Sequence, residues 1–396
     1  MKNIKVFALA AHGKGLSGSD RIFIEFARRW QKVAVVKIYV NEEGREMCRR
    51  QNLSEGTSLK YIVWDTSKWK KLGFVVTYFC RIIHAIFESF KILVNNNSDT
   101  VLYSASEFWM DSLPAFILKL QYPKAIWAAA WYQTAPNPLK GYAEGNRDEK
   151  YTFKALLYWL AQLPVKPIVG NFADHILINN EDERKQFPNA NQKNKLEVVI
   201  GAIDLLRINK WIKSHIHFIK IYDAVFQGRF HPQKGVVELI DIWRKVVDKR
   251  SDAKLAMIGD GPLMENVKLK IKNLKLENNV RLLGYVFDGD EKYKIFSQSK
   301  IVVHPAFYDS GGMASAEAMA FGLPCVGFDL SSYKSYYPKG MVKVETGNIN
   351  KFSNVILELL NNKGKSDKIA REALEMLNKN WSWDTRANEV LNSISN

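Results

Sequence analysis

Short apolar runs rich in Val and Ile alternate with amphipathic segments along the whole chain. This alternation is typical of βαβ units, in which helices cover both faces of a parallel sheet. In the first half the pattern predicts strands at Ile4–Ala10, Val33–Tyr39, Tyr61–Trp64, Thr100–Ser104, Ala125–Ala130, His175–Ile178 and Leu196–Ile200. In the second half it predicts strands at Asp223–Gln227, Lys254–Ile258, Val280–Leu283, Lys300–His304, Pro324–Phe328 and Met341–Val344.

The chain has 396 residues, which is enough for two domains that each bury a core. The weakest strand signal lies at Leu205–Ile221, where Lys, Ile and His mix without a clear period, and we interpret it as an interdomain linker. The pattern thus predicts an α/β fold with two doubly wound domains, residues 1–205 and 206–380, and a cleft between them. Ligands of such domains bind at the carboxyl ends of the strands.

The segment Met1–Ala10 resembles a short signal peptide, but its apolar run is brief and a Gly-rich loop follows, so we expect a first strand there. Cys48, Cys80 and Cys325 lack metal or redox spacing, which favours a reducing compartment.

The net charge is +16, and residues 1–100 hold 17 Lys and Arg against 9 Asp and Glu. A basic surface of this kind suits an anionic membrane, a phosphorylated substrate or nucleic acid. No nucleic-acid motif accompanies the charge, so nucleic acid is the least favoured partner.

Gly73 to Val94 is strongly apolar, yet Arg81, His84, Glu88 and Lys91 recur in it at spacings of three and four. Four ionisable groups argue against a transmembrane span. Two interpretations remain open: a helix packed on the sheet with one solvated polar edge, or a helix seated in a membrane interface. In the second interpretation, Lys68, Lys70 and Lys71 would contact lipid phosphates.

Asp309 and Glu317 place two carboxylates eight positions apart, with a Gly pair after the first and an Ala-rich helix around the second. The buried run Ile301–His304 precedes them, so the order is strand, Gly loop, helix N-terminus. Free backbone N–H groups at a helix start favour an anion. Carboxylates on either side suit hydroxyl-rich groups, so the pattern indicates a nucleotide-sugar.

A second cluster begins where the strand at Asp223–Gln227 ends, with Gly228-Arg229 and Lys234-Gly235. The Arg229 guanidinium can donate two parallel hydrogen bonds to phosphate oxygens, while the Lys234 ammonium supplies a mobile point charge. Together they would neutralise a diphosphate leaving group.

Four blocks of the second half carry a resemblance: Gly228 to Gly235, Met257 to Pro262, Val280 to Val286, and Asp309 to Pro324. In their order and spacing they resemble family 4 glycosyltransferases, which are retaining, nucleotide-sugar-dependent enzymes of the GT-B fold. The resemblance implies two Rossmann-like domains, the first binding the acceptor and the second the donor. Trp381-Ser382-Trp383-Asp384 resembles the family's C-terminal segment, so the helix at about residues 381–396 should pack back on the first domain.

The resemblance also implies roles for single residues. Arg229 and Lys234 would bind the donor diphosphate, Glu317 the ribose hydroxyls, and Asp309 would contact the sugar and support the transition state. The expected catalytic residues are therefore Asp309, Arg229 and Lys234. The remaining expected donor-binding positions are Gly18 in the loop Gly13 to Asp20, Gly228, Leu283, Tyr285, Gly312 and Met313.

The chain departs from the family pattern at two places. The first acid is Asp309 rather than Glu, one methylene shorter, and Trp131-Tyr132-Gln133 stands where the family often has a His. His12, Glu107 and Trp131 are candidates for the acceptor or sugar site, although Trp127, Trp131 and Tyr132 are also expected as core aromatics. His304 is expected to be a packing residue at a strand end.

The sequence therefore predicts a hexosyltransferase of the retaining type, using a UDP- or GDP-sugar without a cofactor and a hydroxyl on a lipid-linked or cell-surface glycan. We expect it in the cytoplasm, at the inner face of a membrane. Asp288-Gly289-Asp290 is read as a turn, so no metal site is predicted. The alternatives are a nucleotide-sugar 2-epimerase of the same fold, a catalytically weak sugar-nucleotide binding protein and a nucleic-acid-binding protein.

Overall fold

The computed structural model describes residues 2–12, 15–135, 153–215, 218–309 and 312–395. The chain divides into two compact units. The N-terminal unit comprises the described residues up to Gly201 together with Trp383 onward, and the C-terminal unit spans Ala202–Ser382.

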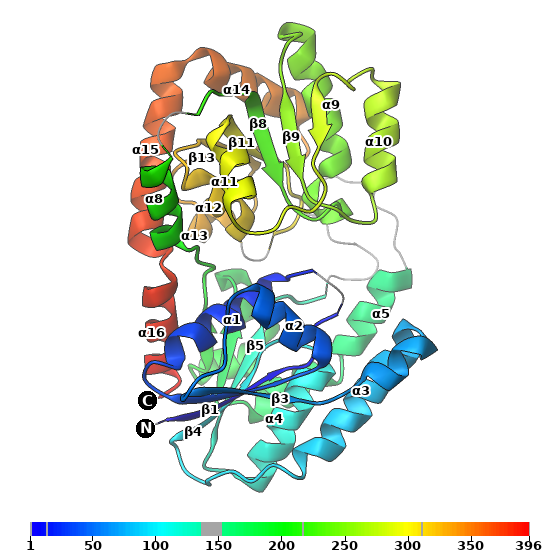
Figure 1. Ribbon diagram of the computed structural model, residues 1–396, viewed down its shortest axis with the longest axis vertical. Helices are drawn as coiled ribbons and strands as arrows, with labels where there is room; N and C mark the ends of the chain where they lie inside the picture. The colour runs from blue at the N-terminus through cyan, green and yellow to red at the C-terminus, as the bar shows by residue number, and fades with distance from the viewer. Residues whose placement is uncertain (1, 13–14, 136–152, 216–217, 310–311, 396) are drawn as a thin grey trace. The chain divides into compact units, whose positions relative to one another are not determined.

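The N-terminal unit contains a parallel sheet of seven strands in the order β3-β2-β1-β4-β5-β6-β7 (Figure 1). The central strands are buried on both faces and read as the continuous apolar runs from which they were predicted, whereas the edge strand β3 exposes Lys60 and Ile62. Phe7, Trp127 and Ile176 lie fully buried in the core that the sheet shares with its helices. The strands are β1 (Asn3–Ala8), β2 (Val35–Val40), β3 (Leu59–Val63), β4 (Thr100–Ser104), β5 (Ile126–Trp131), β6 (His175–Ile178) and β7 (Leu196–Val198).

Helices connect these strands and cover the sheet. They are α1 (Gly18–Trp30), α2 (Glu42–Arg50), η1 (Ser67–Leu72), α3 (Phe74–Ser89), α4 (Trp109–Gln121), α5 (Phe153–Gln162), α6 (Val165–Phe172), η2 (Glu181–Gln186), α7 (Pro188–Gln192) and α16 (Trp383–Ser393). The strand order reverses between β1 and β4, so the loops after these two strands flank the switch point of the sheet.

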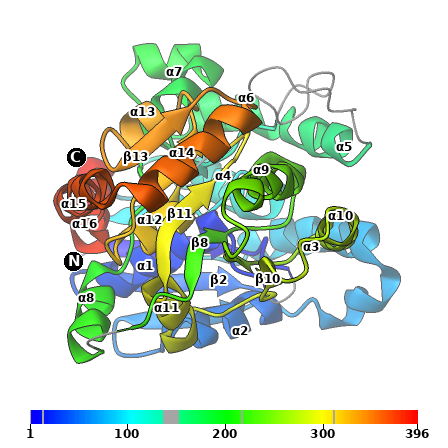
Figure 2. The same cartoon turned by 90° about the horizontal axis from the view of Figure 1, so that it is seen from above.

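The C-terminal unit contains a second parallel sheet, with six strands in the order β10-β9-β8-β11-β12-β13. Helices α9 and α14 pack against each other beside it (Figure 2). The strands are β8 (Tyr222–Gln227), β9 (Leu255–Ile258), β10 (Val280–Leu282), β11 (Ser299–His304), β12 (Cys325–Phe328) and β13 (Met341–Val344). The helices are α8 (Leu205–Ser214), η3 (Pro232–Lys234), α9 (Val236–Lys249), α10 (Met264–Asn273), α11 (Asp290–Ser297), α12 (Met313–Met319), α13 (Tyr333–Tyr336), α14 (Ile349–Asn361) and α15 (Lys363–Asn380).

The thirteen predicted strands are all present, with ends shifted by at most two residues. The predicted fold of two doubly wound α/β domains is therefore confirmed. The expected linker at Leu205–Ile221 is wrong in its first half, which forms α8. Asp204 caps this helix by accepting a hydrogen bond from the Arg207 backbone N–H, and Trp211 packs edge-on against Tyr293.

The last helix, α16, belongs to the N-terminal unit and lies against α1 (Figure 1). The Trp30 indole donates to the Ala387 carbonyl at 2.8 Å, and Trp383 packs edge-on against Phe26. Two residues earlier, Trp381 stacks on Tyr337 inside the C-terminal unit. The chain therefore crosses from one unit to the other at Ser382.

Helix α3 differs from the first interpretation of Gly73–Val94, in which the polar stripe faces solvent; the second, a helix in a membrane interface, stays a prediction. Its polar stripe does not face solvent at Arg81, which is buried and donates to Thr66, the Ala11 carbonyl and Glu43. The apolar positions between the stripe residues are exposed instead. The reason is that polar partners from distant loops satisfy the guanidinium inside the unit. None of the helices in the described part of the chain is long and apolar enough to cross a bilayer.

Candidate active site

The expected donor-binding residues of the C-terminal unit follow neighbouring strands of one sheet. In parallel strands the carboxyl ends share an edge, and the order reverses here between β8 and β11. Leu283 and Tyr285 follow β10, Arg229 and Lys234 follow β8, and Asp309 follows β11. The structure therefore brings these residues to one edge of one sheet.

Glycines let the loops at this edge pack directly on each other. Gly259 has φ of 142°, and a Cβ there would lie 1.9 Å from the Gly228 carbonyl oxygen. Gly235 has φ of 62°, and a Cβ there would lie 1.9 Å from the Pro305 carbonyl oxygen. A side chain at either position would push the loop after β8 away from its neighbours, which explains why glycine stands at 235 and 259.

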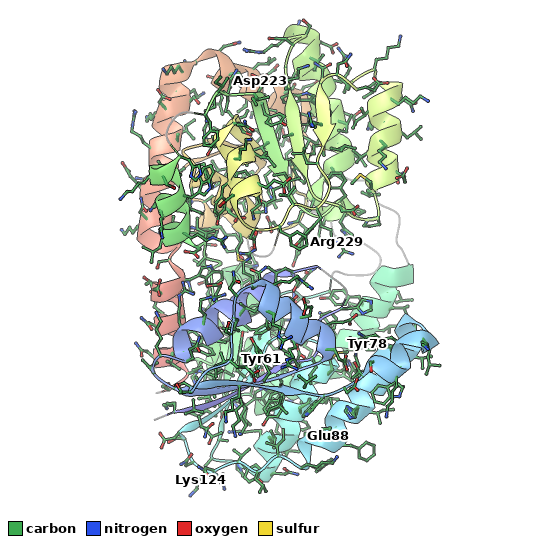
Figure 3. The ribbon with its side chains drawn as sticks, viewed as in Figure 1. Tyr61, Tyr78, Glu88, Lys124, Asp223 and Arg229 are labelled. Atoms are coloured by element: carbon green, nitrogen blue, oxygen red, sulfur yellow. The ribbon has the colours of Figure 1, made fainter. Side chains whose placement is uncertain are left out.

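The two cations after β8 have different surroundings. Arg229 is exposed at the end of the strand (Figure 3). Its guanidinium has no hydrogen-bond or ion-pair partner within the described ranges. Lys234 ends η3 and is mostly buried, with its ammonium 3.1 Å from Asp309 Oδ1. The site thus offers one free cation and one that is held in place.

Asp309 is surrounded by hydrogen-bond donors. Its Oδ1 accepts from Lys234 and from the Gly312 backbone N–H at 3.2 Å. Its Oδ2 accepts from His304 Nε2 at 2.7 Å and from the Tyr333 hydroxyl at 3.1 Å. Burial raises the pKa of Asp309, but the Lys234 ammonium and the His304 hydrogen bond outweigh burial and hold the pKa well below its ordinary value.

The carboxylate form of Asp309 fixes the protonation of its neighbour. Burial lowers the pKa of His304, although the Asp309 carboxylate opposes this. Because the Asp309 carboxylate can only accept, His304 Nε2 is the donor in their hydrogen bond. The sequence placed His304 as a packing residue at a strand end. The structure adds a contact to the first acid of the site.

Glu317, the second acid, lies in α12 and is held by a lysine that the sequence interpretation missed. Lys292 Nζ lies 2.6 Å from Glu317 Oε2 and also pairs with Asp288. Gln227, the last residue of β8, donates to the same Glu317 oxygen at 3.3 Å. Lys292 is 1 % exposed. The only sequence signal for it was the spacing of four between Asp288 and Lys292 at the start of α11.

The backbone between the two acids turns tightly at Gly312, whose φ is 61°. A Cβ there would lie 2.8 Å from the Tyr337 hydroxyl, which donates to the Gly312 carbonyl. Met313 begins α12, a helix of seven residues. Ser310 and Gly311, the rest of the predicted Gly loop, lie outside the described residues.

At the far side of the same edge, Gly284 has φ of 67° and its carbonyl accepts from the Gly259 backbone N–H at 2.8 Å. Leu283 is half-buried, whereas Tyr285 is exposed and packs edge-on against Phe287. Asp288 and Gly289 form the turn predicted for them. Across the described ranges, no cluster of His, Cys, Asp and Glu is arranged to hold a metal ion.

The switch point of the N-terminal unit contains two buried acids. Asp111, at the start of α4, accepts from the Leu9 backbone N–H at 2.6 Å and from Ser106 Oγ at 2.5 Å. Glu107 accepts from the Tyr158 hydroxyl at 2.8 Å. Burial raises the pKa of Asp111 to about 8 and that of Glu107 to about 7. The role of Asp111, which ties the end of β1 to the loop after β4, was not predicted.

The other candidates of this unit are dispersed. His12 is exposed, 3.6 Å from Glu43, and Gly18 is the exposed first residue of α1. Gly13 and Lys14 of the same predicted loop lie outside the described residues. Trp131 is fully buried, donates to Thr134 Oγ1 at 2.8 Å and packs edge-on against Phe187. Trp131 is therefore a core aromatic and presents no ring face to a sugar.

Comparisons with known proteins find similar sequences and folds. Residues 208–376 match the family model of glycosyl transferases group 1. Poly(ribitol-phosphate) alpha-N-acetylglucosaminyltransferase of Staphylococcus aureus (strain COL) is 29% identical over 203 residues, 46% of this chain and 40% of that protein. Poly(glycerol-phosphate) alpha-glucosyltransferase of Bacillus subtilis (strain 168) is 28% identical over 156 residues, 38% of this chain and 23% of that protein. The chain thus spans less than half the length of these two relatives.

Among solved structures, the crystal structure of an S. aureus TarM point mutant in complex with Fondaparinux, alpha-GlcNAc-glycerol and UDP has a TM-score of 0.72. Its sequence identity is 14%, and the likeness covers 100% of both chains, so it establishes the fold. Two Rossmann-like parallel sheets, the family match over residues 208–376 and this likeness lead to one conclusion. The chain has the GT-B fold, and its residues 208–376 are similar to the glycosyl transferases group 1.

Proposed function

We propose that this protein is a retaining glycosyltransferase of family 4, which moves a sugar from a nucleoside-diphosphate sugar to a hydroxyl acceptor. The observation that carries the proposal is the pair of cations after β8, with Arg229 free and Lys234 held by Asp309. Both lie at the switch point of the second sheet, where doubly wound domains bind their ligands.

The donor diphosphate would bind to Arg229 and Lys234. Arg229 can donate two parallel hydrogen bonds to phosphate oxygens, and Lys234 adds a charge whose position Asp309 fixes. The departing diphosphate gains negative charge as the glycosidic bond breaks, so oriented cations stabilise the transition state more than the bound donor. In this proposal the two side chains supply the charge that a divalent cation supplies elsewhere.

The nucleoside would be held on either side of the diphosphate. Glu317 would accept hydrogen bonds from the ribose hydroxyls. Its two described partners share Oε2, so Oε1 is the oxygen that would face the ribose. The base would be read by the backbone around Gly284, with Leu283 and Tyr285 beside it. The neighbouring S. aureus structure holds UDP, which makes uridine the first base to test.

Asp309 would act at the sugar through the groups it orients. Both carboxylate oxygens already accept two hydrogen bonds, so a sugar hydroxyl that donates to Asp309 would have to displace one of these four described donors. We therefore propose that its negative charge supports the positively charged transition state, while the Met313 backbone N–H is offered to the donor and the Gly312 N–H stays on Asp309.

The acceptor would be a lipid-linked or cell-surface glycan, or a related polyol-phosphate polymer, reached from the cytoplasmic face of a membrane. The two curated relatives are named for poly(ribitol-phosphate) and poly(glycerol-phosphate), and for alpha linkages. Glu107 and His12 are the acceptor-side candidates in the N-terminal unit. Glu107, with a pKa raised by burial to about 7, is poised to exchange a proton near neutral pH.

A nucleotide-release assay tests this proposal. Purified protein is incubated with UDP-, GDP- and ADP-sugars, with and without polyol-phosphate or lipid-linked acceptors, and the sugar product is identified. Arg229→Ala should lower turnover about 10²-fold, the scale of losing one oriented electrostatic group. Arg371→Ala, at an exposed arginine of α15, is the matched control and should leave turnover unchanged.

The same assay separates the alternatives. A 2-epimerase would convert the donor sugar without any acceptor, and a binding protein would show donor binding without release. Equal turnover in the wild type and in Arg229→Ala would remove Arg229 from the mechanism. Full activity in EDTA is expected, because the cations of the site are side chains.

A further inference from the structure

Helix α3 exposes a continuous apolar face. Its members recur at spacings of three and four, so they line one side of the helix. Phe79 is 59 % exposed and Phe87 is 64 % exposed, values far above those of core aromatics. The face, here called the α3 surface, comprises Val75, Val76, Phe79, Ile83, Phe87 and Phe90.

The opposite side of α3 fixes this orientation. Arg81 is 5 % exposed and donates to Thr66 Oγ1 at 3.2 Å, the Ala11 carbonyl at 3.1 Å and Glu43 Oε2 at 2.8 Å. Ile82 and Ala85 are buried in the core of the unit. Rotating the helix to bury its phenylalanines would break these three hydrogen bonds and expose the core residues. The apolar face is thus a stable feature of the fold.

Basic side chains flank the α3 surface at both ends. Lys68, Lys70 and Lys71 lie in η1, directly before α3, and Lys91 follows its last turn. Of these, Lys70 pairs with Glu43 and Lys91 with Glu88, so Lys68 and Lys71 are the cations that the inference uses. Gly73, with φ of 84°, forms the bend that joins η1 to α3. An apolar stripe with cations at its ends complements the anionic headgroups and acyl chains of a lipid surface.

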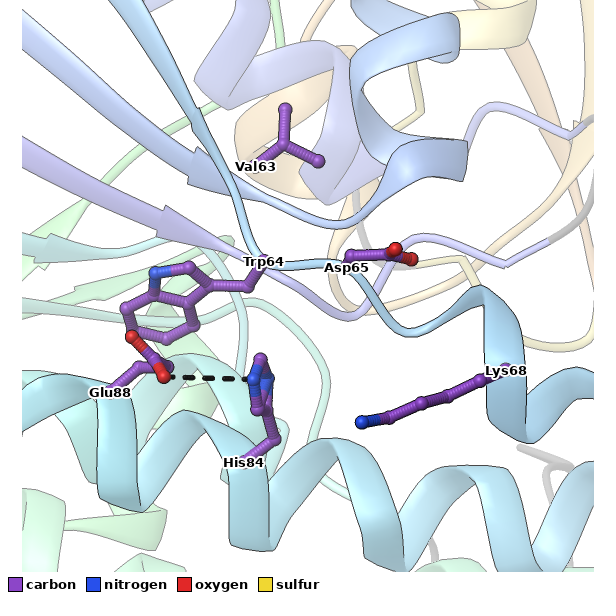
Figure 4. Close-up of a pocket in the computed structure, with 6 residues that line it drawn as sticks. All are labelled: Val63, Trp64, Asp65, Lys68, His84 and Glu88. Carbon is purple, nitrogen blue, oxygen red and sulfur yellow. Dashed lines mark ion pairs between the residues drawn. The ribbon is translucent and has the colours of Figure 1, made fainter.

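A polar pocket lies between α3, which carries His84 and Glu88, and the segment that follows β3 (Figure 4). It is open, about 350 Å³ in volume, and lined by Val63, Trp64, Asp65, Lys68, His84 and Glu88. His84 Nε2 lies 3.7 Å from Glu88 Oε1. The apolar face therefore ends at a hydrophilic rim, the arrangement of an amphipathic helix that lies in an interface plane rather than one that crosses a bilayer.

We infer that the α3 surface docks the N-terminal unit on a bilayer containing anionic lipids. Phe79, Ile83 and Phe87 enter the boundary between headgroups and acyl chains, and Lys68 and Lys71 contact lipid phosphates. This inference does not depend on the proposed transferase activity, because it rests on the exposure and charge of η1 and α3 alone.

Vesicle co-sedimentation tests the inference, using the full chain with phosphatidylglycerol-containing vesicles and with pure phosphatidylcholine vesicles. The wild type should sediment with the anionic vesicles and be released by added salt. Phe79→Glu/Phe87→Glu should weaken this binding at least tenfold. Leu269→Glu is the matched control, because Leu269 is 60 % exposed on α10 of the other unit, and it should bind as the wild type does.

A second variant tests the electrostatic part. Lys68→Gln/Lys71→Gln should weaken binding to the anionic vesicles about 30-fold at low salt, since each lysine near an anionic surface contributes roughly fivefold. It should reduce the salt dependence as well. Binding to phosphatidylcholine vesicles should change little.

Three outcomes would overturn the inference. The first is a wild type that fails to bind anionic vesicles. The second is a Phe79→Glu/Phe87→Glu variant that binds as well as the Leu269→Glu control. The third is a dimer in light scattering that dissociates in the α3 variant, which would assign the face to a second copy of the chain. Nucleotide-induced thermal shifts, measured on the same variants, report separately on the proposed donor site.

Discussion

The acidic side chains Asp309 and Glu317 of the candidate site are held by partner side chains, most of which are distant from them in the sequence. Asp309 is one methylene shorter than the glutamate of the family it resembles, yet it reaches Lys234, His304 and Tyr333. Its folded pKa is lowered, so the stability it contributes is present above its ordinary pKa of 3.8 and is lost as the pH falls through the folded value. The carboxylate is therefore charged throughout the physiological range.

Lys292 gives the sharpest residue-scale prediction for the donor site. Lys292→Met keeps the volume but leaves the Glu317 carboxylate without its buried cation. Glu317 should then move, and the KM for the donor should rise about tenfold or more, with a smaller change in kcat. Lys294→Met, at an exposed lysine of the same helix, is the control. An equal KM in the two variants would mean that Lys292 does not position Glu317.

The raised pKa of Glu107 predicts that the stability of the fold depends on pH. Burial raises its folded pKa from 4.5 to about 7, so below pH 4.5 both the folded and the unfolded chain hold the proton. Between these values only the folded chain holds it, and stability falls as the pH rises through this window. The Tm of Glu107→Gln should therefore fall less than the Tm of the wild type when the pH is raised from 5 to 7. Thermal unfolding at both values measures this, and an identical loss in both proteins would contradict it.

At the scale of elements, the positions of the strands could be predicted from the sequence. The residues that pack around some helices could not. Parallel strands buried on both faces read directly as apolar runs, so β4, β6 and β13 have the predicted bounds. Helix α8 was missed because Lys and Ile mix across it, and its burial depends on Tyr293 and Phe321 from elsewhere in the chain. The polar stripe of α3 was read as solvated because the partners of Arg81 are non-local.

Dependence on residues distant in the sequence also limits how much of the candidate site could be predicted. Arg229, Lys234, Asp309 and Glu317 could be found from spacing, because each follows a predicted strand or lies in the helix after it. The groups that hold them, such as Lys292 and Tyr333, lie in other helices, and apart from the spacing of four between Asp288 and Lys292 they carry no local signal. Trp131 had two interpretations in the sequence, and only its burial decides between them.

Helix α16 makes an element-scale prediction. Trp383 is 1 % exposed and packs against Phe26, whereas Asp384 is about half exposed and pairs with Arg29 at 3.0 Å. Trp383→Ala should destabilise the N-terminal unit by about 3–5 kcal/mol, because it leaves a large cavity. Asp384→Asn should cost less than about 1 kcal/mol, since partly exposed ion pairs contribute little. Urea unfolding measures both, and equal losses would show that α16 is not held by packing.

At the scale of the whole molecule, the family match and the exposed apolar face of α3 lie in different units. Residues 208–376 carry the family match, and they lie entirely in the C-terminal unit. The first hundred residues carry an excess of basic side chains and include the exposed face of α3. One unit thus carries the features proposed for donor binding, and the other those proposed for contact with lipid and acceptor.

The most direct test of the account is calorimetric titration of the protein with UDP, followed by GDP and ADP. We predict that one of these nucleoside diphosphates binds, and that Arg229→Ala weakens its binding about tenfold or more while Arg371→Ala leaves it unchanged. If none of the three binds, or if Arg229→Ala binds as tightly as the wild type, the loop after β8 is not a diphosphate site and the proposed function is wrong.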